Sequence, residues 1–345
     1  MHRRILTLLQ YILFLAAGLI LIWWQLHSMS NEEWKQFTAA FGKVRYWIFL
    51  PVFILVILSH YCRAIRWKIL MEPLGYHPKT KNVFASVMVG YLGNAAVPRL
   101  GEILRCTILA KYEKLKVEKL VGTIVMERTF DMICFFVFIV LTLIIQFNVV
   151  SHHLFELWKK FSHEKGTSLG LKLAVIIGII FLIIITIRFL IRRYPNSKLI
   201  KTIFNFINGM GLGFLAIIKL KRKRAFLMQT LFIWLLYIAQ IYLGFSAMED
   251  TSSLGPGAAC AVLMLATVAM IITPGGIGSF PIFVMEALIL YGVPSTSGAA
   301  FGWLMWGLNT IVIILIGLVA LLLLPYINKP KHESNSKYPF QNLQS

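Results

Sequence analysis

The chain contains repeated apolar runs, each close to the ~20 residues that an α-helix needs to cross the hydrocarbon core of a bilayer. Six such runs are bounded by charged or polar residues: 5–26, 47–70, 120–147, 171–191, 225–248 and 299–324. Hydrophobic residues make up 58% of the 345-residue chain, and its mean hydropathy is +0.76. We therefore expect an all-α fold, a polytopic helical membrane protein with about six spanning helices.

The basic residues lie mainly at the ends of the apolar runs, and they give the chain a net charge of +20. This pattern is typical of cytoplasmic loops that face anionic lipid. It explains the charge better than nucleic-acid binding does, because no RNA- or DNA-binding motif accompanies it. Both ends of the chain are basic, so we expect an integral protein of the cell (inner or cytoplasmic) membrane with cytoplasmic N- and C-termini.

We expect two regions, a transmembrane domain over residues 1–327 and a disordered basic tail over residues 328–345. The apolar run at 5–26 is too long for a signal peptide and lacks a cleavage site, so it is interpreted as the first membrane helix. The four cysteines are scattered and form no metal-binding or disulfide pattern. We therefore expect neither a metal nor a cofactor.

One interrupted unit lies around Pro98, which separates two apolar pieces at residues 83–97 and 100–110. Proline removes a backbone donor and clashes with the preceding turn, so a continuous helix should break there. Each piece is too short to span a bilayer, and basic residues flank the unit on both sides. The unit is therefore predicted to form a re-entrant hairpin that enters the membrane from the cytoplasm.

A second interrupted unit runs from residue 257 to 292 and turns at Thr273-Pro274-Gly275-Gly276-Ile277-Gly278. Cytoplasmic placement of both termini requires this unit to leave from and return to the outer side. The prediction is therefore two re-entrant broken-helix hairpins of opposite orientation, an arrangement found in transporters. No residue-level repeat supports it, so the symmetry is inferred from topology alone.

Charged and amide side chains gather in the first unit and in the run at residues 120–147. Ionisable groups at membrane depth usually mark a path for a substrate or an ion. Placement at the cytoplasmic rim is the alternative for Glu127, Arg128 and Asp131. Arg63 and Arg66, near the end of the run at 47–70, are interpreted as reaching lipid headgroups.

These patterns define a set of candidate substrate-binding residues and no catalytic ones. Arg99 and Arg105 suit a phosphate group, and the backbone N–H groups near Leu100 and Gly278 would also favour an anion. The acidic members would tie the arginines when no substrate is bound, or carry protons. The full set is Asn94, Arg99, Glu102, Arg105, Glu127, Arg128, Asp131, Pro274, Gly275, Gly276, Gly278 and Glu286.

Three short motifs in this order carry a family resemblance: NAAVPRLGEILR at residues 94–105, ERTFD at 127–131 and PGGIG at 274–278. Together they resemble the flippase-like membrane domain of lysylphosphatidylglycerol synthases, over about residues 5–325. The resemblance implies lipid handling. In bifunctional members the membrane half is thought to move aminoacylated phosphatidylglycerol between leaflets, and a soluble half, for which this sequence has no counterpart, makes that lipid.

The sequence departs from the family after the PGGIG turn. An acidic residue usually follows within a few positions, but Phe280-Pro281 stands here and Glu286 comes about a turn later. By resemblance, Glu286 is assigned the role of that acidic residue.

The expected function is translocation of an anionic phospholipid, or of a glycolipid or polyprenyl-phosphate lipid, between leaflets. Two alternatives stay open: an ion or small-anion transporter, and a non-catalytic membrane partner of a lipid-modifying enzyme. An enzyme is not expected, because we find no nucleotide-binding or catalytic motif. The expected partner is a membrane lipid and not nucleic acid, and a homo-oligomer is left open.

Overall fold

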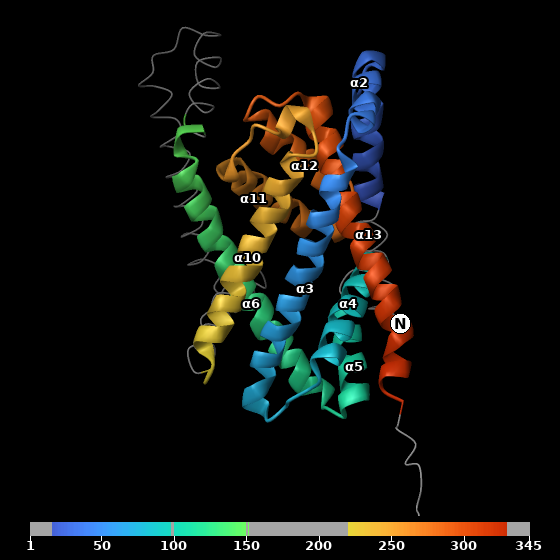
Figure 1. Cartoon of the computed structure of the whole chain (residues 1–345), viewed down its shortest axis with the longest axis vertical. Helices are drawn as coiled ribbons and strands as arrows, with labels where there is room; N and C mark the ends of the chain where they lie inside the picture. Colours follow the sequence, from blue (N-terminus) through green and yellow to red (C-terminus); the bar gives the residue numbers. More distant parts are fainter. Residues whose placement is uncertain (1–15, 98–99, 150, 152–219, 330–345) are drawn as a thin grey trace, which may run out of the picture.

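A computed structural model describes residues 16–97, 100–149, 151 and 220–329, and this part of the chain is helical throughout apart from its connections (Figure 1). A helix over Ala16–His27 comes first. The α-helices that follow are α2 Asn31–Gly42, α3 Phe49–Met71, α4 Thr80–Ala96, α5 Leu100–Glu113, α6 Val117–Ile145, α10 Lys223–Phe245, α11 Pro256–Ile272, α12 Ser279–Ile289 and α13 Ser295–Ile327. Short 3-10 turns occur at Tyr46–Ile48, Glu72–Leu74, Glu249–Thr251 and Pro274–Gly276.

Four helical segments in the described residues are long and apolar enough to cross a membrane: Tyr46–Leu74, Val117–Ile145, Lys223–Phe245 and Ser295–Ile327. They match four of the six predicted spans, and the chain is a polytopic helical membrane protein. The predicted span at residues 5–26 is described only from Ala16 onward. The predicted span at 171–191 and the tail at 330–345 lie outside the described residues, so the count of six stays a prediction.

Polar bonds gather several helix ends at one end of the bundle, which we call the basic end. Arg222 before α10 pairs with Glu72 after α3, with 2.8 Å between Nη1 and Oε1. Asn82 in the first turn of α4 donates to Glu113 at the end of α5 over 2.6 Å. The same amide exchanges two 2.9 Å hydrogen bonds with Asn328, which follows α13. The α4–α5 hairpin therefore begins and ends at the basic end, the lower end in Figure 1.

The α11–α12 hairpin lies toward the other end of the molecule, in the upper half of Figure 1. There the Arg45 N–H donates to the Ala247 carbonyl over 2.9 Å, and the Ser297 hydroxyl donates to Asp250. These bonds join the connection that precedes α3, and the first turn of α13, to the connection that precedes α11. The two short hairpins thus open toward opposite ends of the bundle, in the predicted order. Their re-entrant placement in a bilayer stays a prediction.

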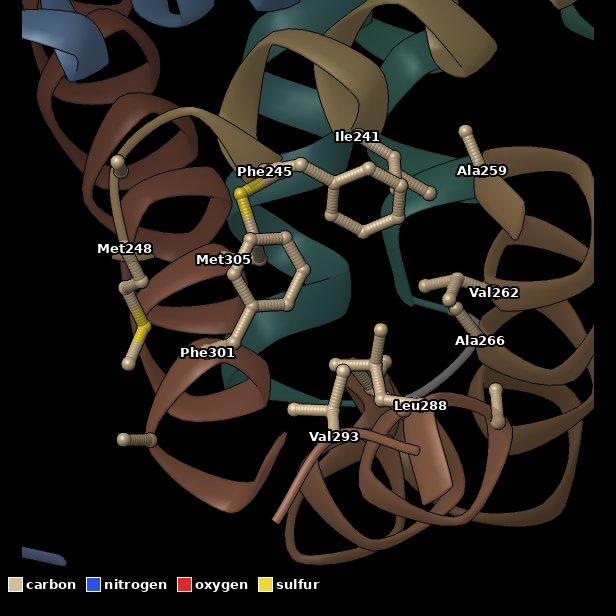
Figure 2. Packing of buried hydrophobic residues seen from close by; sticks show 14 of the residues in the cluster. Ile241, Phe245, Met248, Ala259, Val262, Ala266, Leu288, Val293, Phe301 and Met305 are labelled. Atoms are coloured by element: carbon tan, nitrogen blue, oxygen red, sulfur yellow. The ribbon is translucent and has the colours of Figure 1, made fainter. Parts of the chain in front are cut away.

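The largest apolar core lies among α10, α11, α12 and α13. Figure 2 shows Phe245 of α10 beside Phe301 and Met305 of α13, with Val262 of α11 and Leu288 of α12 completing the contact. All five side chains are buried. This packing attaches the α11–α12 hairpin to two of the long helices, because burying such side chains together is the main favourable contribution to packing.

The α4–α5 hairpin depends on glycine where its two helices cross. Its helices end and begin at Ala96 and Leu100, so the predicted break around Pro98 is confirmed, although Pro98 and Arg99 themselves are not among the described residues. A Cβ atom at Gly101 would lie 1.9 Å from the Gly90 carbonyl oxygen and 2.6 Å from the Asn94 side chain. Only glycine at 101 lets the two backbones approach this closely.

We predict that Gly101→Ala destabilises the protein, because its methyl group meets backbone and cannot be relieved by a side-chain rotation. Overpacking of this kind costs ~1–3 kcal/mol. The matched control is Gly122→Ala in α6, where no heavy atom lies within 4 Å and alanine is the better helix former. Thermal unfolding followed by size-exclusion chromatography in detergent should show a lower midpoint for Gly101→Ala alone. Equal midpoints for both variants would contradict the close crossing.

We predict that the basic end faces the cytoplasm, because lysine and arginine concentrate in the connections there. Green fluorescent protein fused after Ser345 should fluoresce in a bacterial host, whereas alkaline phosphatase at the same position should be inactive. Alkaline phosphatase fused after Ser252, at the opposite end of the bundle, should be active. The reverse pattern of activities would show that the orientation is wrong.

Candidate functional site

Two acidic residues of α6 face two arginines of α3 inside the bundle. Glu127 and Asp131 lie one turn apart, as do Arg63 and Arg66, so the two pairs can meet along adjacent helix faces. Arg63 Nη1 lies 3.3 Å from Glu127 Oε1 and 2.9 Å from Asp131 Oδ2. Arg66 lies 3.0 Å from Glu127 Oε1 through Nη2 and 2.6 Å from Asp131 Oδ1 through Nη1. The four side chains form a cross-linked set between α3 and α6.

A third arginine joins this set from α5. Arg105 Nη2 lies 2.9 Å from Glu127 Oε2, so both oxygens of Glu127 are paired. The Arg105 guanidinium also lies over the Trp67 ring, 3.8 Å from its centroid, an arrangement that favours a cation. Glu127 is fully buried and Arg105 is 4% exposed. We call Arg63, Arg66, Arg105, Glu127 and Asp131 the buried ion network.

Hydroxyl groups hold the buried ion network in place from α10 and α6. Tyr237 accepts a 3.1 Å hydrogen bond from Arg63 Nη2, and Thr230 accepts one of 3.3 Å from Arg66 Nη1. Trp67, beneath Arg105, donates from its indole N–H to Thr123 over 2.8 Å. These bonds fix the arginine side chains, so α3, α5, α6 and α10 are joined through one polar centre.

The interpretation of Arg63 and Arg66 as residues that reach lipid headgroups is wrong. Arg66 is 0% exposed and Arg63 is 7% exposed. Removing a charge from water costs several kcal/mol unless it is paired with good geometry, and Glu127 and Asp131 provide that pairing. With its carboxylates ionised, the network holds three positive and two negative charges, and one positive charge is left over.

A cleft adjoins the buried ion network between α4, α5 and α6. It is narrow, with a volume of ≈ 10 Å³, about the room that one water molecule needs. Arg105 belongs both to its wall and to the network, whereas Arg128 of α6 reaches it from the more exposed side. We call it the arginine cleft, and its lining residues are Val87, Gly90, Tyr91, Asn94, Gly101, Glu102, Arg105 and Arg128.

The polar groups of the arginine cleft are only lightly held. Arg128 Nη2 lies 3.3 Å from Glu102 Oε1, and the two side chains are 43% and 34% exposed. Asn94 accepts a 2.8 Å hydrogen bond from the Gly101 N–H and donates to Glu102 over 3.4 Å. The second oxygen of Glu102 accepts no hydrogen bond from the described residues. The Arg128–Glu102 contact is more exposed than the pairs around Glu127.

The predicted glycine turn forms the tip of the α11–α12 hairpin. Gly275, Gly276 and Gly278 all have positive φ, between 64° and 73°, a conformation that favours glycine. Trp306 of α13 donates its indole N–H to the Gly275 carbonyl over 2.8 Å. The Pro274–Gly276 turn also lies beside α4. The two hairpins that the sequence predicted to meet therefore do meet.

The structure brings together six of the predicted site residues. Asn94, Glu102, Arg105, Glu127, Arg128 and Asp131 share the network or the cleft. Pro274, Gly275, Gly276 and Gly278 build the neighbouring turn. Glu286 is exposed on α12 and pairs with no described basic side chain, and Arg99 lies outside the described residues.

Sequence reasoning missed Arg63 and Arg66 as members of the site, along with Trp67, Tyr91 and Tyr237. The available signal was two arginines three residues apart on one apolar run and two acidic residues, Glu127 and Asp131, four residues apart on another, so that each pair lies about one helical turn apart. In the described part of the chain no group of three metal-binding side chains occurs. The cleft presents the guanidinium groups of Arg105 and Arg128, donors that suit an anionic oxygen group.

Comparison with known proteins places these features in a family. The family described as "Lysylphosphatidylglycerol synthase TM region" matches residues 10–317. A UPF0104 membrane protein of Methanocaldococcus jannaschii is 26% identical over 290 residues, covering 79% of this chain and 83% of that protein. No solved structure gives a significant match. This chain, with its two opposed short hairpins and buried arginines, belongs to the lysylphosphatidylglycerol synthase transmembrane region family.

Proposed function

We propose that this protein moves an anionic lipid, a phospholipid or a lipid-linked phosphate, between the leaflets of the cell membrane. The observation that carries the proposal is the arginine cleft, where Arg105 of a charge-unbalanced buried network and the half-exposed Arg128 line the same narrow cleft. A charged headgroup that crosses ~30 Å of hydrocarbon needs such polar groups at depth.

The excess of positive charge favours an anion as the ligand. Three arginines surround two carboxylates in the buried ion network, and the cleft adds the balanced pair of Arg128 and Glu102. A phosphate group must widen this narrow cleft to enter it, and it would then gain Arg128 as a partner at the expense of the exposed contact with Glu102. Arginine suits this exchange because its planar fork matches two phosphate oxygens at once.

The opposed hairpins suggest how the headgroup path is built. Short broken helices that enter from opposite sides expose backbone donors near the midplane, where a substrate can bind. In this chain the α4–α5 hairpin and the Pro274–Gly276 turn lie side by side. We propose that both are re-entrant, that the basic end faces the cytoplasm, and that the acyl chains stay in lipid while the headgroup passes.

The proposed activity is movement of a lipid and not its synthesis. The family match concerns the transmembrane region, and its printed description links it to lysylphosphatidylglycerol synthases. With no nucleotide-binding motif in the sequence, the flow would be downhill or driven by an ion gradient. Vesicles that carry anion flux without lipid movement would instead favour a small-anion transporter.

We predict that Arg128→Gln slows lipid translocation about tenfold or more, since one charge-assisted hydrogen bond contributes ~1.5–3 kcal/mol. The purified protein would be placed in vesicles with fluorescent phosphatidylglycerol, and dithionite quenching would report the lipid in each leaflet. The matched control is Arg222→Gln, which removes another exposed arginine–glutamate pair far from the cleft. Arg99→Ala should also reduce the rate. Equal rates for Arg128→Gln and the wild type would refute the site.

We predict that Glu127→Ala destabilises the protein by ~3–5 kcal/mol, because it leaves three buried arginines with one acidic partner. Glu286→Ala is the control, since Glu286 is exposed and makes no ion pair with the described residues. Thermal midpoints in detergent should fall strongly for Glu127→Ala and change little for Glu286→Ala. A wild-type midpoint for Glu127→Ala would show that the network is dispensable for folding.

A further inference from the structure

An apolar groove runs along the outside of α3 and α4, separate from the arginine cleft. Ile54, Ile57, Leu58 and Tyr61 line it from α3, where their spacing puts all four on one helix face. Thr80, Lys81 and Phe84 line it from α4. Its volume is ≈ 570 Å³, within the ~300–1,000 Å³ range of small-ligand sites. We call it the α3–α4 groove.

The groove has a positively charged end. Lys81 lines it and is exposed, and Lys68 donates from Nζ to the hydroxyl of the lining residue Thr80 over 2.7 Å. Neither lysine pairs with an acidic side chain anywhere in the described chain. Both lie near the turn between α3 and α4, at the basic end. The α3–α4 groove is therefore apolar along its length and cationic at the basic end.

One stripe of α4 connects this groove to the arginine cleft. Thr80, Phe84, Val87, Tyr91 and Asn94 follow one another at alternating steps of four and three residues, which keeps them on one helix face. The first two line the groove, and the last three line the cleft. Between them, the His60 ring of α3 packs on Tyr91 with 4.6 Å between centroids. The groove and the cleft thus share one face of α4, and Val87, which lies between them on that face, is 1% exposed, so packed side chains separate the two in this structure.

We propose that the α3–α4 groove binds one acyl chain of an anionic phospholipid whose phosphate lies at Lys81 and Lys68, and that it is the lateral entrance to the arginine cleft. The inference rests on the proposed function for its occupant, the lipid that the protein moves. Each lysine near the surface adds ~1 kcal/mol of attraction to an anionic lipid. A zwitterionic lipid lacks the net charge needed for this attraction.

The test uses full-length protein in vesicles that contain phosphatidylglycerol with a photoactivatable diazirine in its acyl chain. After irradiation, labelled peptides are identified by mass spectrometry. We expect labelling of the segment from Ile54 to Tyr61 and of Phe84, reduced by excess phosphatidylglycerol and not by phosphatidylcholine. Lys81→Gln should raise about fivefold the concentration of phosphatidylglycerol needed to compete with the label, the factor that corresponds to ~1 kcal/mol. Lys116→Gln, an exposed lysine at the same end that lines neither the groove nor the cleft, should leave it unchanged.

A second variant tests the groove by shape. Leu58→Trp places a larger side chain in the groove and should abolish labelling there while the protein still elutes as a folded peak. Equal labelling of the outward residues Ile311, Leu315 and Leu318 of α13, with no headgroup preference, would overturn the proposal, because those residues face any lipid. Labelling of the groove without lipid translocation would refute the proposed transport and support binding at the groove. Translocation without labelling would refute the groove alone.

Discussion

The arrangement of the helices around the site depends on one interaction, the pairing of the buried Glu127 carboxylate with arginines of α3 and α5. An isolated carboxylate could not remain charged there, and neither could the arginines without it. Moving α3 or α5 away from α6 would break these ion pairs and leave buried charges unpaired, so the pairs hold the three helices together. In this way α5, which belongs to a short hairpin, is fixed to the long helices by charge as well as by apolar contact.

The same pairing leaves a charge that the site cannot neutralise by itself. Asp131 forms ion pairs with Arg63 and Arg66, whereas Arg105 contacts only Glu127 and the Trp67 ring. A network with a purely structural role would be more stable with equal numbers of acidic and basic side chains, because no buried charge would then be left unpaired. Arg105, the extra guanidinium, lies at the wall of the arginine cleft. An anion that enters the cleft would neutralise the remaining positive charge of the network.

Much of this fold follows from local sequence signals. Proline at 98 and the glycines of the PGGIG turn predict where helices break, and both breaks are present. The spacing of Glu127 and Asp131 predicts a shared face. Local patterns do not say which distant residue lies opposite, and Arg66 is 61 residues away from Glu127. They also predicted a site role for Glu286, which is exposed on α12, because the largely apolar pattern of α12 does not select an inward face.

The contacts around the site differ in how readily they can change. The tip of the α11–α12 hairpin is held by the Trp306 indole and lies so close to the first helix that a Cβ at Gly278 would meet the Gly18 carbonyl at 2.4 Å. The pairs around Glu127 are buried and mostly 3.0 Å or shorter. Arg128 and Glu102 are 3.3 Å apart and partly exposed, so water or a phosphate can replace either partner at low cost. If the protein alternates between states, the exchange of partners at Arg128 is the step that requires the least disruption of the fold.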